Sequence, residues 1–242
     1  MSWLIIDHTK TIEREENIGF SLVEAKGKRE LEERPRCPFC RRQVWMHTVI
    51  WQEKYRFTGQ RIGDASWELG VDFVVSKRFK DAWEYEQLNG IRFSEIPINV
   101  RAKSKAKFDP DDSCYFKVYP EPVFARFQDT ANVVYKEEPR CSVCMSSEVV
   151  ELGEAIFDNS FDLDCCLVSC LPGWTIVSDR FFSFVKNYKF TNFFFMKGFS
   201  RSGVDRNLLR RSFLIPSKNG NYEQINACDD LCLDEILRGL VK

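Results

Sequence analysis

Two cysteines separated by two residues close the stretch ERPRCPFC, residues 33–40. A second stretch, EEPRCSVC at residues 137–144, has Glu, Pro, Arg and both cysteines in the same places. Cys37 therefore corresponds to Cys141, at an offset of 104 residues, and the second cysteine of each stretch corresponds likewise. Two thiolates alone do not complete a tetrahedral metal site, so the function of one CxxC pair depends on the other.

A second pair of matching segments follows the CxxC pairs. The stretch GVDFVVSKRFKDAW begins at Gly70 and the stretch GWTIVSDRFFSFV begins at Gly173, and both contain Val-Ser-x-Arg-Phe, at an offset of 102 residues. Self-similarity in the same order is typical of a repeated structural unit. The sequence thus predicts an α+β protein of two pseudo-repeats, residues 34–135 and 136–242, after an N-terminal strand and connector at 1–33, all in one compact unit.

Each Val-Ser-x-Arg-Phe segment predicts a strand that runs into a helix. The β-branched and aromatic runs VDFVV and WTIV favour strands, and Ser76 and Ser178 follow them as helix N-caps. A further apolar run follows each helix as a strand, and DDLCLDEILRGLVK, residues 229–242, predicts a C-terminal helix. Apolar residues at helical spacing predict one buried face for each of the first two helices. They are Phe79, Ala82 and Trp83, and then Phe181, Phe184, Val185 and Tyr188.

Composition places the chain among globular proteins. It has 242 residues, a formal net charge of −1, 44% apolar and 14% aromatic residues. That is enough for a substantial buried core, and it excludes a disordered or broadly basic protein. The start, MSWLIIDHTK, lacks the basic region of a secretory signal, and no apolar stretch is long enough to cross a membrane. We therefore expect a cytoplasmic protein without a membrane partner.

Ten cysteines are many for a reducing compartment, where clustered CxxC pairs bind metal more often than they form disulfides. Cys37, Cys40, Cys141 and Cys144 supply four thiolates, so we expect one closed structural zinc site per chain that joins the two pseudo-repeats. A redox pair and two metal-free thiol pairs remain alternatives. The other six cysteines are interpreted as small buried hydrophobes. They are Cys114, Cys165, Cys166, Cys170, Cys228 and Cys232.

No catalytic set emerges from the sequence. The two histidines are His8 and His47, and the motifs of serine hydrolases, P-loop proteins and zinc proteases are missing. Arg78 and Arg180 recur in the first helical turns, where a carboxylate across the repeat interface or solvent would suit them equally. The sequence predicts that the protein is not an enzyme and has no small-molecule substrate.

The two CxxC turns about a hundred residues apart, with a VVS-x-R segment after the first, resemble the double-CxxCG proteins. That family is abundant in myxobacteria and includes immunity proteins paired with transferred toxins. The segment DFVVSKRFKDAWE…LNGIRF is also similar to immunity proteins of bacterial polymorphic toxin systems. The resemblance covers about residues 34–195 and implies that the four CxxC cysteines bind a metal, zinc by expectation. The family's glycine after each CxxC is replaced by Arg41 and Met145, where a left-handed backbone is expected.

The resemblance implies a protein that binds a cognate toxin and blocks it in bacterial competition. Acidic stretches that would suit a basic toxin cleft are DPDDS, residues 109–113, and DNSFDLD, residues 158–164, although solvated loops have the same composition. The alternative is a zinc-stabilised nucleic-acid-binding or regulatory module that uses the basic residues of 101–107 and of DRNLLRR, residues 205–211. Nucleic acid is the less favoured partner, because the first basic stretch lacks interleaved aromatic residues.

Overall fold

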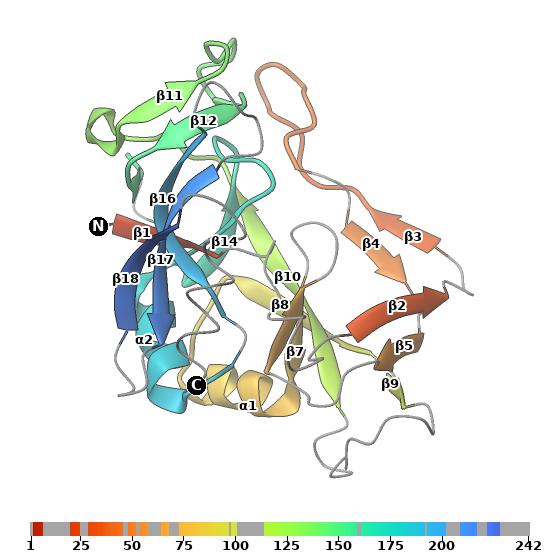
Figure 1. Cartoon of the computed structure of the whole chain (residues 1–242). Coiled ribbons are helices and arrows are strands. Elements are labelled where there is room, and N and C mark those ends of the chain that lie inside the picture. The colour runs from red at the N-terminus through yellow and green to blue at the C-terminus, as the bar shows by residue number, and fades with distance from the viewer. Residues whose placement is uncertain are drawn as a thin grey trace.

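The computed structural model of the chain is shown in Figure 1. It describes residues 2–6, 20–24, 29–45, 48–51, 54–57, 64–67, 73–96, 98–100, 114–158, 161–191, 193–201, 209–216 and 222–227. Helices and strands both occur within these residues, so the coarse prediction of an α+β fold is confirmed. The predicted C-terminal helix at 229–242 lies outside the described residues.

The strands and helices follow one another along the chain with these bounds. They are β1 (Ser2–Ile6), β2 (Phe20–Glu24), β3 (Arg29–Glu32), β4 (Thr48–Trp51), β5 (Lys54–Phe57), β6 (Ala65–Trp67), β7 (Phe73–Ser76), α1 (Lys77–Tyr85), β8 (Ile91–Ile96), β9 (Ile98–Val100), β10 (Tyr115–Val123), the 3-10 turn η2 (Asp129–Ala131), β11 (Val133–Tyr135), β12 (Val149–Leu152), β13 (Ala155–Ile156), β14 (Cys165–Val168), β15 (Thr175–Val177), α2 (Asp179–Tyr188), β16 (Phe195–Arg201), β17 (Leu209–Pro216) and β18 (Tyr222–Ala227).

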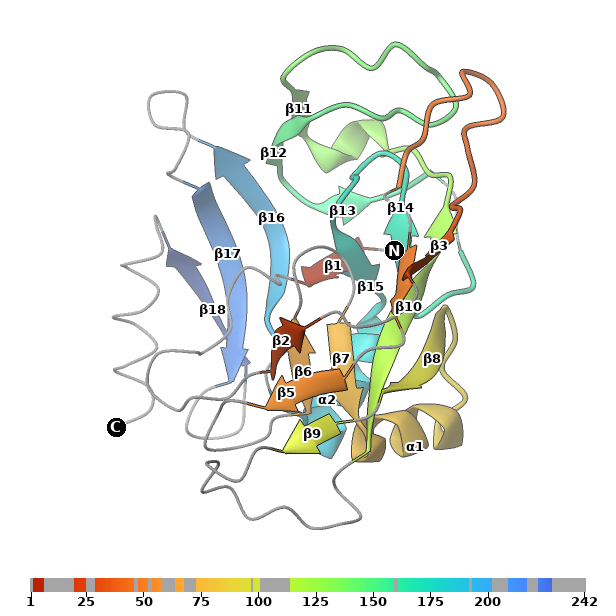
Figure 2. The same cartoon turned by 90° about the vertical axis from the view of Figure 1, so that its right-hand side faces the viewer.

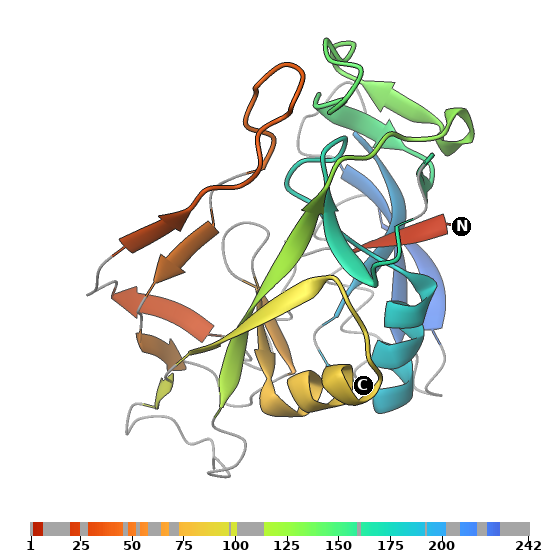
Figure 3. The same ribbon diagram turned by 180° about the vertical axis from the view of Figure 1, so that it is seen from behind.

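Most of the strands join one large mixed sheet in the order β11-β12-β16-β1-β15-β14-β10-β7-β6. Beside this path, β13 pairs with β1, β17 pairs with β16 and β18, and β8 pairs with β10. Two small sheets, β2-β5-β9 and β3-β4, lie across β10 from β16, β17 and β18 (Figures 1 and 3). The two helices lie near each other at one end of the large sheet, as Figure 3 shows from behind.

Both helices begin where the sequence predicts. The Ser76 side chain accepts a hydrogen bond from the Phe79 amide at 3.2 Å, and the Ser178 side chain accepts one from the Phe181 amide at 3.1 Å. Each cap satisfies an amide of the first turn that has no partner within the helix. The predicted apolar face of each helix is buried except at Tyr188, which is partly buried, so the predictions of capping and of helical periodicity are confirmed.

Two hydrophobic cores lie on the two faces of the large sheet, and β1 contributes to both. Leu4 and Ile6 pack in the core that contains the apolar faces of α1 and α2. Trp3 and Ile5 point to the other core, which the segment from β10 to β13 helps to cover. Successive side chains of a strand alternate between faces, and all four are buried, so β1 is a central strand of the sheet.

Two sets of elements around the helices have matching registers. We name β6, β7, α1, β8 and the first part of β10 the α1 unit, and β14, β15, α2, β16 and β1 the α2 unit. Ala65 pairs with Val75 in the first, and Cys165 pairs with Val177 in the second. On the other side of the same strands, Val75 pairs with Phe116 of β10, whereas Val177 pairs with Leu4 of β1.

Aromatic rings join the two units at the helices. The Phe79 ring of α1 lies 5.3 Å from the Phe184 ring of α2 and 6.2 Å from the Phe181 ring, measured between centroids. Beyond α1, the chain turns at Gly90, where an added Cβ would meet the Cys165 carbonyl oxygen at 2.2 Å. Only glycine allows the α1 unit to approach β14 so closely, and its φ of +96° favours glycine as well.

Candidate metal centre

The two CxxC stretches fold into the same tight turn. The Arg41 amide donates to the Cys37 carbonyl oxygen at 3.0 Å, and the Met145 amide donates to the Cys141 carbonyl oxygen at 3.0 Å. Arg41 has a φ of 59° and Met145 a φ of 49°, so both adopt the left-handed conformation expected of the position after CxxC. A side chain there costs roughly 1–2 kcal/mol relative to the right-handed region, which indicates that the rest of the turn imposes the conformation.

The turns bring four sulfur atoms together from distant parts of the sequence. Cys37 Sγ lies 3.7 Å from Cys141 Sγ, and Cys40 Sγ lies 3.8 Å from Cys144 Sγ. All four sulfurs lie within 4.8 Å of one another. Four zinc–sulfur bonds of about 2.3 Å in a tetrahedron put neighbouring sulfurs about 3.8 Å apart. The spacing and the donor type therefore fit a four-thiolate zinc site.

The surroundings of the sulfurs are largely apolar. Cys37, Cys141 and Cys144 are buried, and they pack with Val44, Trp45 and Leu167, while Cys40 is exposed. The Trp45 ring stacks edge-on against Phe124, with centroids 4.9 Å apart. One side of the cluster thus faces the protein interior and the other faces solvent through Cys40, which gives an ion an entry route.

The thiols do not ionise alike. The backbone amide of Cys144, more than any other group, lowers the pKa of Cys141 to about 6. Burial raises the pKa of Cys144 to about 12. Four thiolates in contact repel one another, so full ionisation of the cluster needs a cation at its centre. A dication would supply that charge and would release the protons that remain on the metal-free thiols.

Two further contacts tie the turns to the rest of the fold. The Arg42 guanidinium donates to the Ser146 carbonyl oxygen at 3.4 Å, which links the segment after the first turn to the segment after the second. The Arg126 guanidinium donates to the Ser142 carbonyl oxygen at 2.8 Å and so fixes the tip of the second turn. Neither CxxC turn leads directly into a helix, which a thioredoxin-like redox pair would require.

The remaining described cysteines have a different environment. Cys165, Cys166 and Cys170 are fully buried in the cores, as the sequence predicts for small hydrophobes, and burial raises the pKa of each thiol. Cys114 is partly buried. Cys228 and Cys232 lie outside the described residues. Among the described residues, the CxxC set is the one group of Cys, His, Asp or Glu side chains that could enclose an ion.

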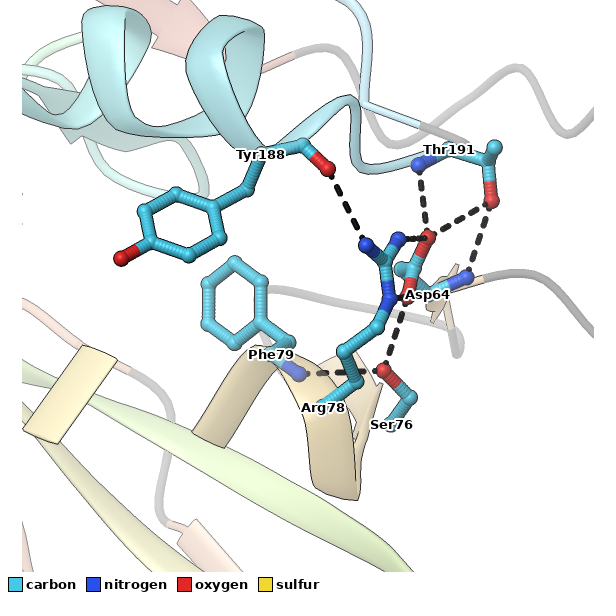
Figure 4. Close-up of polar contacts among 6 residues, drawn as sticks. All are labelled: Asp64, Ser76, Arg78, Phe79, Tyr188 and Thr191. Atoms are coloured by element: carbon cyan, nitrogen blue, oxygen red, sulfur yellow. Dashed lines mark hydrogen bonds and ion pairs between the residues drawn. The ribbon is translucent and has the colours of Figure 1, made fainter. Parts of the chain in front are cut away.

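The arginine of each Val-Ser-x-Arg-Phe segment binds an aspartate to which the sequence analysis did not assign it. Arg78 donates to both carboxylate oxygens of Asp64, at 3.1 and 2.7 Å. The same carboxylate accepts from the hydroxyl of Ser76 at 2.9 Å and from the amide of Thr191 at 2.9 Å. Figure 4 shows Asp64 enclosed by these donors, with Arg78 reaching on to the Tyr188 carbonyl oxygen at 3.0 Å.

Asp164 makes the same kind of contacts in the α2 unit. It accepts from the Ser178 hydroxyl at 2.8 Å, from Arg180 at 3.2 Å and from the Asn89 amide at 3.1 Å. Arg180 also donates to the carbonyl oxygen of Glu86 at the end of α1. Each arginine therefore binds the aspartate of its own unit and the last turn of the helix of the other unit. Of the two roles that the sequence leaves open for these arginines, pairing with a carboxylate is the one observed. The carboxylate belongs to the same unit, and the contact across the units is made to a carbonyl oxygen.

A sequence signal for the two aspartates exists. Asp64 stands 12 residues before Ser76, and Asp164 stands 14 residues before Ser178. The gap of two residues hides the match from an ungapped comparison of the segments. Thr191 and Asn89, which bind Asp64 and Asp164 respectively, are again 102 residues apart.

Several predicted sites lie wholly or partly outside the residues that the structure describes. His8, His47 and the acidic stretch 109–113 lie outside the described residues, as do residues 101–107 and 205–208 of the basic stretches. In the other acidic stretch, Asp158 and Asp162 are exposed, whereas Asp164 is buried in the network described above and is not accessible to a partner.

No helix in the described part of the chain is both long and apolar enough to cross a membrane. A scan against protein-family models matches no family, and a search of curated proteins finds no similar protein.

Proposed function

We propose that the chain is a non-enzymatic binding protein held together by one structural zinc ion, with Cys37, Cys40, Cys141 and Cys144 as its ligands. The observation that carries the proposal is the cluster of four sulfur atoms, all within 4.8 Å of one another. Four protein ligands fill a tetrahedral site and leave no position for a substrate. The ion then contributes to folding, because the unfolded chain has no preformed site.

The same ion would join two pseudo-repeats, residues 34–135 and 136–242, since each supplies one CxxC turn. Matching contacts support this duplication. The caps, the arginine–aspartate pairs and the left-handed residues after both helices recur at offsets of 100 to 102 residues, the last as Gln87 and Lys189. Two of the places where the two halves contact each other are the CxxC turns and the two helices. The proposed zinc site stabilises one, and the two aspartate networks together with the helix contact stabilise the other.

We further propose that the protein is an immunity protein that binds and neutralises a cognate toxin in the cytoplasm. The support is the resemblance of the CxxC and Val-Ser-x-Arg-Phe segments to double-CxxCG immunity proteins. An inhibitor of this kind needs a rigid surface, because flexible partners lose affinity when they order on binding. A zinc ion bound by cysteines of both halves would make the surface that they share more rigid.

Metal analysis tests the zinc site. We expect about one zinc per purified chain, and loss of the metal in the variant Cys37→Ser or Cys141→Ser with a fall in stability of several kcal/mol. Cys114→Ser is the matched control and should keep its zinc. Equal metal content and melting temperature in Cys37→Ser and the control would contradict the proposal of a shared zinc site.

Co-expression tests the immunity role. The product of a toxin-like neighbouring gene should stop growth when it is expressed alone, and growth should recover when this chain is co-expressed and co-purifies with it. Failure to co-purify together with failure to restore growth would end the immunity proposal. Binding to generic DNA or RNA that weakens steeply with salt would instead favour the nucleic-acid-binding module.

A further inference from the structure

The outer edge of β8 differs from the corresponding edge in the α2 unit. β16 pairs with β1 on one side and with β17 on the other, where Phe195 faces Leu214 and Met196 faces Phe213. Its counterpart β8 pairs with β10 along its full length, and no other described strand pairs with it. Figure 2 shows β8 at the rim of the molecule, outside β10.

The β8 edge has the features of a strand that accepts another. Its six residues pair with β10 in an unbroken register, without the bulge that natural proteins use to block an edge. Proline is also missing from Ile91–Ile96. The outer edge of a sheet presents a row of backbone N–H and C=O groups, to which an added strand can form hydrogen bonds.

Side chains on the two faces of β8 define what the added strand should carry. On the helix side, Phe93 packs edge-on against Trp83, with centroids 6.3 Å apart, which favours an apolar neighbour as Leu214 is for Phe195. On the opposite side, the exposed Arg92 lies over the Tyr119 ring, which favours an acidic neighbour. Glu95 lies on the same face as Phe93, and its exposed carboxylate favours a basic residue in the added strand.

We propose that the edge of β8 binds an extended segment of another protein, antiparallel to β8, with an apolar residue opposite Phe93, an acidic residue opposite Arg92 and a basic residue opposite Glu95. A second copy of this chain fits less well. If two copies pair antiparallel about a two-fold axis at Phe93, the Arg92 side chains of the two copies lie diagonally across the paired strands. If the axis lies at Ser94, the two Glu95 side chains lie diagonally across them. Like charges therefore meet in both registers.

A short peptide tests the proposal with the full-length protein. The probe is a fluorescein-labelled Val-Lys-Thr-Val-Glu-Val, which in antiparallel register sets its Lys opposite Glu95 and its Glu opposite Arg92. We expect saturable binding by fluorescence anisotropy. A second probe with Lys replaced by Glu should bind about two- to fivefold more weakly, and this preference should reverse for the variant Glu95→Lys.

Backbone methylation provides the decisive control. Two versions of the probe carry N-methyl groups on alternate residues, so that one set blocks the amides that face β8 and the other blocks the amides that face away. Strand addition predicts that one version loses binding and the other keeps it, because successive amides of a strand point in opposite directions. Equal effects of the two versions, or no saturable binding at millimolar probe, would overturn the proposal.

The outcome is independent of the zinc and toxin experiments, since neither enters the assay. Sedimentation of the protein alone checks the competing occupant. A monomer supports the proposal, whereas a dimer that the probe dissociates would show that a second copy covers β8 and would overturn it.

Discussion

In the α1 unit β10, beside β7, belongs to the same run of chain, whereas in the α2 unit β1, beside β15, comes from a segment far earlier in the sequence. β10 follows β8 along the sequence and pairs with it, Ser94 facing Lys117. β1 takes the matching place beside β16, Ile5 facing Met196. Nearly the same architecture is therefore closed by a local connection in one unit and by a distant segment in the other. The α2 unit should depend on a contact that the α1 unit does not need.

The largest expected effect is the loss of β1. Deletion of residues 1–6 removes four buried side chains, Trp3 to Ile6, each of which stabilises by about 1.5–3 kcal/mol. The sum of about 6–12 kcal/mol matches the whole stability of a typical domain, so we expect the α2 unit to unfold. Hydrogen exchange would show lost protection in β15 and β16.

A synthetic peptide of residues 1–7 supplied in trans provides the control, because it should restore protection in β15 and β16. If the deleted chain melts within a few degrees of the full chain, β1 is dispensable and the contrast between the units fails.

The two aspartate networks offer a smaller and graded test. Asp64 accepts five hydrogen bonds and Asp164 accepts three. Replacing a carboxylate by an amide turns one acceptor oxygen into a donor that faces other donors, at a cost of about 2–3 kcal/mol. We expect Asp64→Asn to lower the free energy of unfolding more than Asp164→Asn, as measured by urea denaturation.

Asp81→Asn is the matched control for both changes. Asp81 is half exposed and pairs only with Lys77 of the same helix face in the described structure, so its loss should change stability by about 0.5 kcal/mol or less. If Asp81→Asn lowers the free energy of unfolding as much as Asp64→Asn does, the aspartate networks contribute no more to stability than a surface ion pair.

Alkaline pH distinguishes the units through a buried thiol. Cys165 of β14 stands where the α1 unit has Ala65, and burial raises the pKa of the Cys165 thiol well above its usual value of 9.0. Since the folded pKa of this thiol exceeds the unfolded one, its contribution to the free energy of unfolding is constant below about pH 9 and falls above it as the unfolded thiol ionises. At pH 10 the loss is about 1.4 kcal/mol for this thiol.

The variant Cys165→Ala should therefore lose about 1.4 kcal/mol less than the natural chain between pH 8 and pH 10, as urea midpoints at the two values would show. Parallel losses in the two proteins would mean that Cys165 is already ionisable in the folded state.

The smallest expected effect concerns the two CxxC turns. Arg41→Gly or Met145→Gly relieves a left-handed side chain, and the gain of about 0.5–1 kcal/mol is partly offset by the greater freedom of glycine when unfolded. Equal gains in thermal stability at the two positions would support equivalent turns. Ser142→Gly, at a position without a positive φ, should lower stability instead.

The sequence was sufficient for features that depend on near neighbours. Ser76 and Ser178 cap helices because their oxygens lie within one turn of the amides they accept from, and the apolar spacing after each serine already indicates the buried face. The match of Cys37 to Cys141 likewise predicts a shared cluster, since two CxxC turns together supply the four thiolates that a tetrahedral metal site needs. Asp64 and Asp164 could have been found only by allowing a gap in that comparison.

By itself, the sequence determined the four cysteines, the two strand-to-helix segments and their internal repetition, because each is encoded within a few consecutive residues. Only the tertiary structure decided that β1 completes the α2 unit, that each arginine reaches the other unit's helix, and that β8 keeps an outer edge without a described partner. Hydrophobic periodicity specifies which face of a strand is buried but not which strand lies beside it. Strand neighbours are chosen by the packing of the whole sheet, where residues more than a hundred positions apart compete for the same edge.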